Sequence, residues 1–513
     1  ILVTVNFGSS QNIKQKIAKD ARSPTPKSYR DSAVEGLKFS KKDDDESDSG
    51  DDTNDDNERR RRDMLDAQHT AFELHKEVYD TKQSYNNQQD RNAFFDDNEA
   101  RGDPVRRVIN KRSASKVLKV GTDCSGMEAP IQALHNLDAK FEHLFSCDND
   151  PKSRQTILAN FPPKEMYEDI TTRVNANTPC VDLYVAGFPC QPFSTAGKQQ
   201  GFDDVKGRGN IFYDVLDYID TRRPKVFILE NVKGLTTLQQ GKCLRKILAA
   251  LHGIKGPGAT QGSAYEIHHE VLNTKDHLIP HNRPRWYCVG IRKDTFVTDK
   301  SSFHFPDVKL NCPSIELFLD NDKLGATQSK SNPEQPSLQG LTNTARQNIT
   351  KARKSILSNG HNPDELPYVV DCDASTSKSK HIHDLTPCIT RSRHQGHWIT
   401  NRNRRMTIYE MFRLQGMDHT QFIVAPGVTI KDLGQQLGNA MSVNVIERVI
   451  LQALNAANLE FCLGRPNAKD RWANGEALQQ LQQGIGKPFK NYTDPVPPGR
   501  FHERIVVPFS SEG

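Results

Sequence analysis

The stretch Val181–Ser194 (VDLYVAGFPCQPFS) places a cysteine just after a short apolar run. Residues 181–186 are mostly β-branched or apolar, which predicts a buried strand. Glycine and proline follow at once, so Cys190 stands in a stiff turn at the carboxyl end of that strand, where open α/β sheets place reactive groups. Its thiol could be a nucleophile if its pKa lies below the ordinary ~8.5, or it could be a buried structural cysteine, the commoner case.

The composition indicates a folded protein with a polar, unstructured portion. Of 513 residues only 35% are hydrophobic, a low share that suggests disorder in part of the chain. Residues 1–110 carry few apolar side chains, and within them the acid-rich run 41–58 precedes four arginines at 59–62. Runs of like charge usually form solvated tails, although the arginines could also be a nuclear address or contact nucleic acid. We therefore expect 1–110 to be a disordered, charged N-terminal region.

The ten cysteines form neither a zinc-binding pattern nor a disulfide framework, so we expect reduced, intracellular thiols and no metal site. No long uncharged apolar run and no secretory signal is visible in the sequence, which predicts a soluble protein.

The order of the elements predicts an α/β fold. We expect strands at 117–121, 141–147, 181–186, 225–230, 265–272 and 285–291, with helical patterns between most of them. Strands that alternate with helices imply a Rossmann-like, doubly wound and mostly parallel sheet. From about 294 to 385 the alternation fails, which predicts an inserted smaller domain or a long functional loop region. Helical patterns return at 406–414, 430–437 and 442–459.

Acidic residues follow three early strands, at Asp123, Asp148 and Asp169. In a Rossmann-like sheet a carboxylate after the second strand accepts hydrogen bonds from ribose hydroxyls, and Asp148 has that place. Asp169 could bind an adenine amino group. The full glycine fingerprint of dinucleotide sites is missing from the sequence, which favours a smaller nucleoside cofactor.

Glu230 ends the strand 225–230 about forty residues after Cys190, a distance that suits one βαβ crossover. Adjacent parallel strands would place the two side chains at the same edge of the sheet. A glutamate behind an apolar strand is costly to bury unless it is used or paired, although it could simply cap a turn. Arg283 and Arg285 precede the next strand and could clamp an anion or orient a carboxylate.

Taken in order over roughly 117–292 and 404–455, these segments resemble the cytosine carbon-5 DNA methyltransferases. The segment around Cys190 is similar to the family's nucleophile loop, and Glu230-Asn231-Val232 to its Glu-Asn-Val motif. His281–Arg285 is similar to the Gln-x-Arg-x-Arg motif. Residues 405–416 resemble the helix that follows target recognition, and 436–443 the last motif, which returns to the cofactor.

The chain departs from the family pattern in two places. Cys124, Glu128 and Ala129 stand where the first motif usually has a Phe and a Gly pair, which puts the aromatic packing against adenine in doubt. His281 replaces the usual Gln at a structural position.

The resemblance implies a class I methyltransferase fold, S-adenosyl-L-methionine as the methyl donor and duplex DNA as the substrate. Its catalytic domain would have two parts, 111–293 and 404–460, around a target-recognition region at 294–403, with a C-terminal extension at 461–513. The glycine-containing segment 191–210 is typical of a loop that closes over the substrate.

The resemblance also implies roles for individual residues. Cys190 would attack carbon 6 of a flipped-out cytosine, and Glu230 would stabilise ring nitrogen 3 and the exocyclic amine. Arg285 would help to hold the base and the glutamate, Arg283 would support it, and Asn231 would position the nucleophile loop. The cofactor would lie against Cys124, Ser125, Gly126, Met127, Glu128, Asp148, Asn149, Asp169, Ile170, Pro189, Asn439 and Met441. DNA would be contacted by Gln191, Ser194, Lys198, Arg391, Arg393 and Arg405, although such basic residues could also be a solvated surface.

Two alternatives stay open. One branch of the family methylates transfer RNA, but its Cys-Phe-Thr motif is missing from the sequence of 294–403, which favours DNA. The other alternative is a catalytically inactive DNA- or chromatin-binding homologue, against which the presence of Cys190 and Glu230 argues. The acidic run and the arginines predict a nuclear protein if the source is eukaryotic, with chromatin or protein partners for the N-terminal tail.

Overall fold

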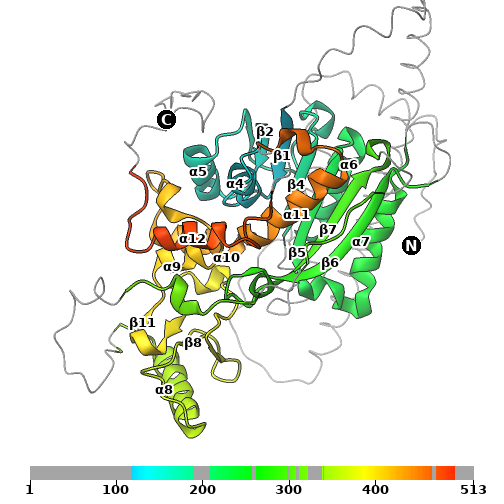
Figure 1. Cartoon of the computed structure of the whole chain (residues 1–513). Helices are drawn as coiled ribbons and strands as arrows, with labels where there is room; N and C mark the ends of the chain where they lie inside the picture. Colours follow the sequence, from blue (N-terminus) through cyan, green and yellow to red (C-terminus); the bar gives the residue numbers. More distant parts are fainter. Residues whose placement is uncertain are drawn as a thin grey trace, which may run out of the picture. The chain divides into compact units, whose positions relative to one another are not determined.

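The computed structural model describes residues 117–189, 208–256, 262–296, 301–307, 311–321, 338, 340–464 and 469–491. Their centre is a seven-stranded sheet in the order β3-β2-β1-β4-β5-β7-β6 (Figure 1). The strands are β1 Leu118–Asp123, β2 Phe141–Cys147, β3 Glu165–Tyr167, β4 Leu183–Ala186, β5 Val226–Val232, β6 Tyr265–Asn273 and β7 Pro284–Arg292. The first five run parallel, while β7 pairs antiparallel with both β5 and β6.

This topology confirms the predicted doubly wound, mostly parallel α/β sheet. The expected strands are all present, but β6 and β7 form an antiparallel pair where strict strand–helix alternation would have made them parallel. The three-residue strand β3 was not predicted, because a strand that short carries no readable alternation of apolar and polar side chains.

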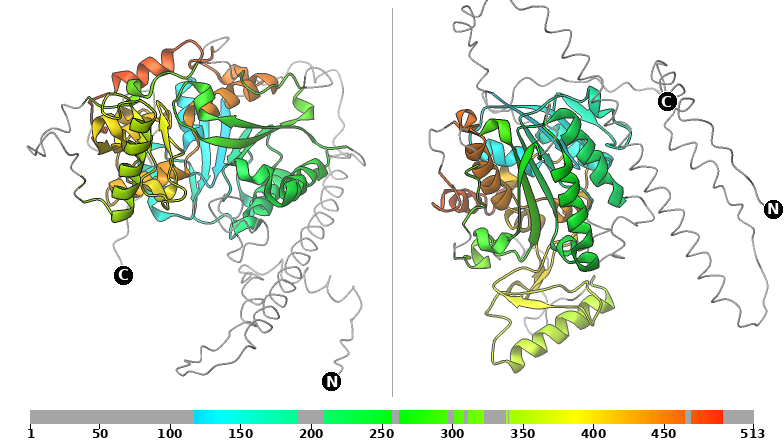
Figure 2. Two further views of the ribbon diagram at one scale, coloured as in Figure 1. Left: turned by 90° about the horizontal axis from the view of Figure 1, so that it is seen from below. Right: turned by 90° about the vertical axis from the view of Figure 1, so that its right-hand side faces the viewer.

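Successive side chains of a strand point to opposite faces of the sheet, and both faces of the central strands β4 and β5 are buried. On β4, Leu183 and Val185 enter one apolar cluster, while Tyr184 and Ala186 enter the other. The first cluster contains side chains of α4 (Ala129–Asn136) and α11 (Val443–Ala456), and the second those of α6 (Ile211–Arg222) and α7 (Lys242–Gly253). Figure 2 shows helices on both faces of the sheet.

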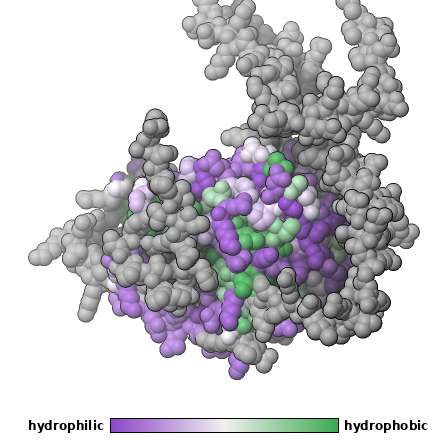
Figure 3. Space-filling model, turned by 90° about the horizontal axis from the view of Figure 1, so that it is seen from above, coloured by the Kyte–Doolittle hydropathy of each residue, from purple (hydrophilic) through white to green (hydrophobic). Residues whose placement is uncertain are grey.

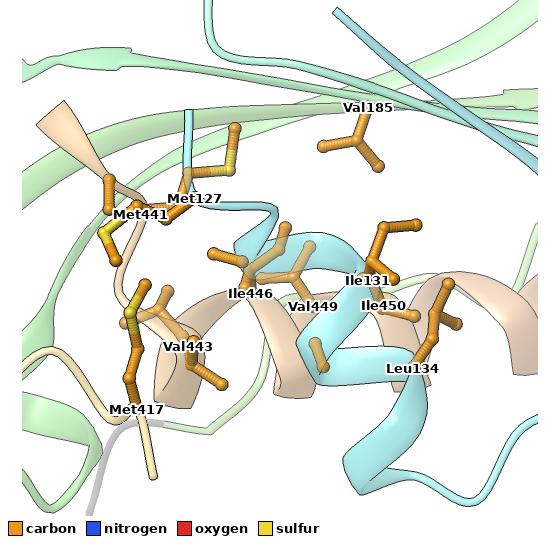
Figure 4. Close-up of a cluster of buried hydrophobic side chains, with 14 of the residues drawn as sticks. Met127, Ile131, Leu134, Val185, Met417, Met441, Val443, Ile446, Val449 and Ile450 are labelled. Carbon is orange, nitrogen blue, oxygen red and sulfur yellow. The ribbon is translucent and has the colours of Figure 1, made fainter. Parts of the chain in front are cut away.

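Apolar packing joins helices α4 and α11, which lie far apart in the sequence. Ile131 and Leu134 of α4 lie against Ile446, Val449 and Ile450 of α11, with β4 above them (Figure 4). Each fully buried aliphatic side chain contributes about 1.5–3 kcal/mol relative to exposure, so this contact fixes α11 onto the first half of the sheet.

The inserted region has a small sheet and a helix of its own. The strands β8 (Tyr368–Val370), β9 (His381–His383), β10 (Trp398–Ile399) and β11 (Arg404–Arg405) form an antiparallel sheet in the order β11-β10-β8-β9. Helix α8 (Asn343–Ser358) packs Ala345, Ile349 and Ala352 against Val370, Cys372 and Trp398. The sequence did not predict α8, because three of its five buried residues are alanine or asparagine rather than large apolar residues.

The remaining helices are α5 (Pro151–Asn160), α9 (Ile408–Arg413), α10 (Ile430–Asn439) and α12 (Glu476–Gln483). The last described residues pack onto the segment around α9: the ring of Phe489 contacts those of Tyr409, Phe412 and Phe422, and the Lys490 amide donates to the Phe422 carbonyl at 3.0 Å. Within the described part of the chain, no helix combines the length and apolarity needed to cross a membrane. Seen from above, the surface is mainly hydrophilic around a central group of hydrophobic side chains (Figure 3).

Two glycines let the segment 390–394 of the insert lie directly on helix α10. A Cβ on Gly438 would be 2.2 Å from the amide nitrogen of Arg391, and one on Gly434 would be 2.3 Å from the carbonyl oxygen of His394. The two glycines are four residues apart, so they share one face of the helix. That face is where the insert meets the second part of the main domain.

We expect Gly434→Ala and Gly438→Ala to lower stability by about 1–3 kcal/mol each, because the new methyl group meets backbone atoms that cannot rotate away. The measurement is the melting temperature by circular dichroism. Gly253→Ala is the matched control, since a Cβ at this last residue of α7 meets nothing within 4 Å. Unchanged melting for the two α10 variants would mean that the insert does not dock as described.

Candidate active site

Three predicted site segments converge on Gly187, the residue that follows β4. A Cβ placed on Gly187 would lie 3.0 Å from Cε of Met441, 3.7 Å from Oε2 of Glu230 and 3.9 Å from the carbonyl oxygen of Cys124. The loop after β1, the end of β5 and the segment after α10 therefore meet at the carboxyl edge of the parallel strands, where open α/β sheets bind their ligands.

Cys190 lies outside the described residues, as do Gln191, Ser194 and Lys198, but the chain that leads to it is well held. Phe188 is buried, and its carbonyl accepts a hydrogen bond of 3.1 Å from Nδ2 of Asn231. The strands β4 and β5 are adjacent and parallel, with Ala186 opposite Leu229. The expected neighbourhood of the two strand ends is confirmed, and Asn231 ties them together.

Glu230 and Arg285 form an ion pair at this edge. Nε of Arg285 lies 3.1 Å from Oε1 of Glu230, and the glutamate is only 7% exposed. Burial raises the pKa of Glu230, and the lowering by Arg285 and then Arg283 does not offset it. A carboxyl group in this state keeps its proton to higher pH than an ordinary glutamate and can donate a hydrogen bond.

Arg283 has a different environment from Arg285. It is fully buried, and its Nη1 donates to the carbonyl of Ile389 at 2.6 Å. Its Nη2 donates to the carbonyls of Gly438 at 3.1 Å and Ala440 at 2.6 Å. The sequence suggested that either arginine could clamp an anion, but Arg283 binds main-chain oxygens and so joins the insert to the end of α10.

His281 stands where the family pattern has a glutamine, and its ring makes two hydrogen bonds to the main chain. Its Nδ1 lies 3.0 Å from the carbonyl of Leu414, and the Ile389 amide donates to its Nε2 at 3.0 Å. Burial and then Arg283 keep the pKa of His281 well below its usual range, so the ring is neutral. Because Nε2 accepts, we assign the proton to Nδ1. A neutral imidazole offers one donor and one acceptor, as the usual glutamine side chain does.

The loop after β1 and the end of β2 form the predicted cofactor side. Oδ2 of Asp148 accepts from the Gly126 amide at 2.8 Å, and Oδ1 accepts from the Asp150 amide at 2.9 Å. Cys124 and Gly126 both have left-handed backbone angles, and a Cβ on Gly126 would meet nothing within 4 Å. The loop is therefore held by Asp148 while open space remains beside it.

Asp169 lies farther along the same edge. Its Oδ1 accepts from the Thr171 amide at 2.8 Å, and its side chain lines a cavity of about 510 Å³ together with Met166, Thr172 and Arg173. Neither Arg173 nor this cavity was foreseen from the sequence, because nothing in a loop residue's neighbours indicates its partner.

Some of the predicted cofactor residues turn inward. The Glu128 carboxylate accepts from Thr122 at 2.7 Å and from Ser146 at 2.6 Å, and burial raises its pKa to about 8. Met127, Glu128 and Ile170 are buried, so Glu128 can reach a ligand only through its backbone. Asp123 is also internal, because it binds Arg173 at 2.6 and 2.7 Å and the hydroxyl of Tyr184 at 2.6 Å.

The three arginines predicted to contact DNA differ in whether a carboxylate already pairs with them closely. Arg393 pairs with Asp371 at 2.5 Å, and Arg405 pairs with Asp373 at 2.7 and 2.8 Å. The Arg391 side chain is 51% exposed and lies 3.7 Å from Asp150. Of these three arginines, Arg391 is the one best placed to meet a phosphate, and DNA contact by all three stays a prediction.

A segment of the insert that the sequence did not single out reaches this site. The amide of Thr386 donates to the carbonyl of Pro280, and the amide of Asn282 donates to the carbonyl of Thr386, both at 2.9 Å. Residues 386–389 therefore run beside 280–283 and bring Cys388 to the two arginines. Such a pairing between positions a hundred residues apart leaves no pattern in either segment.

Comparison with known proteins gives consistent matches. Residues 122–455 match the family model described as C-5 cytosine-specific DNA methylase. The chain is 32% identical over 340 residues to Type II methyltransferase M.NgoBI of Neisseria gonorrhoeae, covering 64% of this chain and 90% of that protein. It is 29% identical over 318 residues to Type II methyltransferase M.HaeII of Haemophilus aegyptius, covering 62% and 87%. Among solved structures, the Dnmt2 methyltransferase of S. pombe matches with a TM-score of 0.44 and 17% identity, covering 66% of this chain and 99% of that chain.

The two arginines should separate in a stability experiment. Arg283→Lys should lower the free energy of unfolding by about 3 kcal/mol, because an ammonium group leaves buried carbonyls without a donor. Arg285→Lys should lower it by less, about 1 kcal/mol, because a lysine keeps the positive charge beside Glu230 at the edge of the sheet. Urea unfolding followed by circular dichroism measures both. Equal losses would contradict the assignment of Arg283 as the joining residue.

Proposed function

Because the chain belongs to the C-5 cytosine-specific DNA methylase family, we propose that it transfers a methyl group from S-adenosyl-L-methionine to carbon 5 of cytosine in duplex DNA. The observation that carries this proposal is the meeting of Cys124, Glu230 and Met441 around Gly187. The loop proposed to bind the cofactor and the Glu230 carboxyl group, proposed to bind the base, thus meet beside the turn that leads to Cys190.

The cofactor would supply an activated methyl group on a sulfonium centre, and the residues present fit its nucleoside part. Asp148 accepts two backbone hydrogen bonds and keeps lone pairs for ribose hydroxyls. Asp169 would accept from the adenine amino group. Asn439 and Met441, just after α10, would close the site from the other side. Cys124 cannot supply the aromatic packing that a phenylalanine would give to adenine.

The chemistry would depend on Cys190. Carbon 5 of cytosine is a poor nucleophile, and attack of the Cys190 thiolate on carbon 6 makes the ring enamine-like, so that carbon 5 can accept the methyl group. Loss of the carbon 5 proton and departure of the thiolate then restore the ring and the free enzyme. A cytosine inside the duplex hides carbon 6, so the base must first be flipped out at a cost of about a few kcal/mol.

Glu230 would assist this attack by donating a hydrogen bond or proton to ring nitrogen 3 and binding the exocyclic amine. Its burial supports the role, because the raised pKa keeps the carboxyl group protonated to higher pH. Arg285 would hold Glu230 in place through the 3.1 Å contact. Asn231 would position the nucleophile turn through the Phe188 carbonyl.

We also propose that the protein is nuclear if its source is eukaryotic, on the basis of the acidic run 41–58 and the arginines 59–62, which lie outside the described residues. Arg391 would contribute a phosphate contact, and the strength of such contacts falls with salt.

The function is tested by incubating the full chain with S-adenosyl-L-methionine and unmethylated or hemimethylated duplex DNA, followed by bisulfite sequencing. We expect 5-methylcytosine with the wild-type protein and none with Cys190→Ser, which should still bind the cofactor. A parallel reaction on transfer RNA tests the alternative substrate. Turnover by Cys190→Ser would falsify the nucleophile, and methylation of RNA alone would replace DNA as the substrate.

The role of Glu230 predicts a pH profile. The rate of the wild type should fall at alkaline pH as Glu230 loses its proton, because the protonated form is the competent one. Glu230→Gln should lower kcat by on the order of a hundredfold and remove this alkaline limb, since an amide cannot ionise. Steady-state rates between pH 6 and 10 and DNA binding by fluorescence anisotropy are the measurements. A loss confined to DNA affinity would assign Glu230 to binding instead.

A further inference from the structure

Cys388 is a residue of the insert that touches both arginines of the base-binding site. Its Sγ lies 3.6 Å from Nη1 of Arg283 and 3.7 Å from Nη2 of Arg285, both donors. Arg285 in turn holds Glu230 at 3.1 Å. The Cys388 sulfur therefore contacts the same guanidinium group that holds Glu230, the proposed acid.

The position of Cys388 is fixed by main-chain bonds on both sides of it. Thr386 pairs with the segment before β7 through the Pro280 carbonyl at 2.9 Å, and the Ile389 amide donates to His281 at 3.0 Å. The Ile389 carbonyl accepts from Arg283 at 2.6 Å. These bonds hold the backbone on both sides of Cys388 against the segment before β7, so the contact of the sulfur with Arg285 depends on how the insert sits on the main domain.

The surrounding charges favour a sulfur that accepts hydrogen bonds. Burial alone would raise the pKa of Cys388, but Arg285 and then Arg283 outweigh it and bring the pKa below the ordinary value. The other titratable groups that face it are Glu230 and the buried rings of His281 and His397, whose pKa values burial lowers, so both rings stay neutral near pH 7. Negative charge on Cys388 also raises the pKa of Glu230.

We propose that Cys388 is a positioning residue of the methyl-transfer reaction: its sulfur accepts from Arg283 and Arg285, keeps Arg285 aimed at Glu230, and thereby couples seating of the recognition insert to the state of the base-binding carboxyl group. This inference rests on the proposed function. It does not require Cys388 to touch the cytosine. If Cys388 only filled space, a small apolar side chain could replace it without effect. If its sulfur accepts hydrogen bonds from the arginines, such a replacement should impair the reaction, so the proposal can be tested.

The experiment compares Cys388→Ala, Cys388→Ser and the wild type as full-length proteins, with duplex DNA and S-adenosyl-L-methionine. Cys388→Ala should lower kcat by on the order of tenfold or more, because a misaligned guanidinium group no longer holds Glu230 in its reactive geometry. KM for cofactor should stay within about threefold. Cys388→Ser keeps an acceptor and should recover a large part of kcat. Cys312→Ala, at an exposed cysteine of the same insert, is the control.

The pH profile gives a readout that packing alone would not move. In Cys388→Ser, where Arg285 stays aimed at Glu230, loss of the ionisable sulfur lowers the pKa of Glu230, so the alkaline limb of kcat should shift to lower pH, while that of Cys312→Ala stays with the wild type. Melting temperatures accompany each variant. Should Cys388→Ala fold poorly, the serine variant still decides the matter through its pH profile.

Two results would overturn the inference alone: wild-type kcat and pH profile in both variants, or a kcat that is normal in Cys388→Ala but reduced in Cys388→Ser, as expected for an apolar packing site. A wild-type protein that methylates neither DNA nor RNA would instead overturn the proposed function, and the inference with it.

Discussion

The site depends on one buried cation, Arg283. No carboxylate forms an ion pair with it among the described residues, and its Nη1 and Nη2 atoms donate to carbonyl oxygens of Ile389, Gly438 and Ala440. Two of these carbonyls stand at the carboxyl end of α10, where helices carry unsatisfied oxygens and partial negative charge. The partial negative charge of the helix end stabilises the guanidinium group and offsets part of the free-energy cost of burying it. The insert, the main sheet and the last motif meet through this guanidinium group.

Burial has opposite consequences for buried acids and bases of this protein. It raises the pKa of Glu230 beside the junction and of Glu128 in the loop after β1, so that both carboxyl groups hold protons more tightly. It lowers the pKa of His281, which then serves as a neutral pair of hydrogen-bonding atoms. The cost of a charge in a dry environment thus favours the protonated carboxyl group that the proposed role of Glu230 requires, and the neutral ring that His281 uses in its two hydrogen bonds. What separates the two roles is position: Glu230 stands at the open edge of the sheet, and His281 stands between two main-chain segments.

The fold was largely predictable because its signals are local. Apolar runs marked β1, β2, β4 and β5, and the spacing between Cys190 and Glu230 placed two strand ends together. Helix α8 escaped prediction because much of its buried face consists of alanine and asparagine, and β3 because it has only three residues. At the site, the family resemblance already assigned Arg285 to Glu230 and gave Arg283 a supporting role, but it did not name the carbonyl oxygens that Arg283 binds. The carbonyl partners of Arg283 lie 106 to 157 residues away along the chain, and only the folded structure brings those segments to it.

The packing of α4 against α11 has a consequence for synthesis. The apolar face of α4 is covered by a helix encoded on the order of three hundred residues later, so at ~5–20 residues per second it waits tens of seconds for its partner on the ribosome. The whole recognition insert is translated during that interval. An alteration that lengthens the insert would prolong the exposure of this face, and a premature stop before α11 would leave it permanently uncovered. The apolar core around α4 can therefore be completed only after the C-terminal third of the chain has been synthesised.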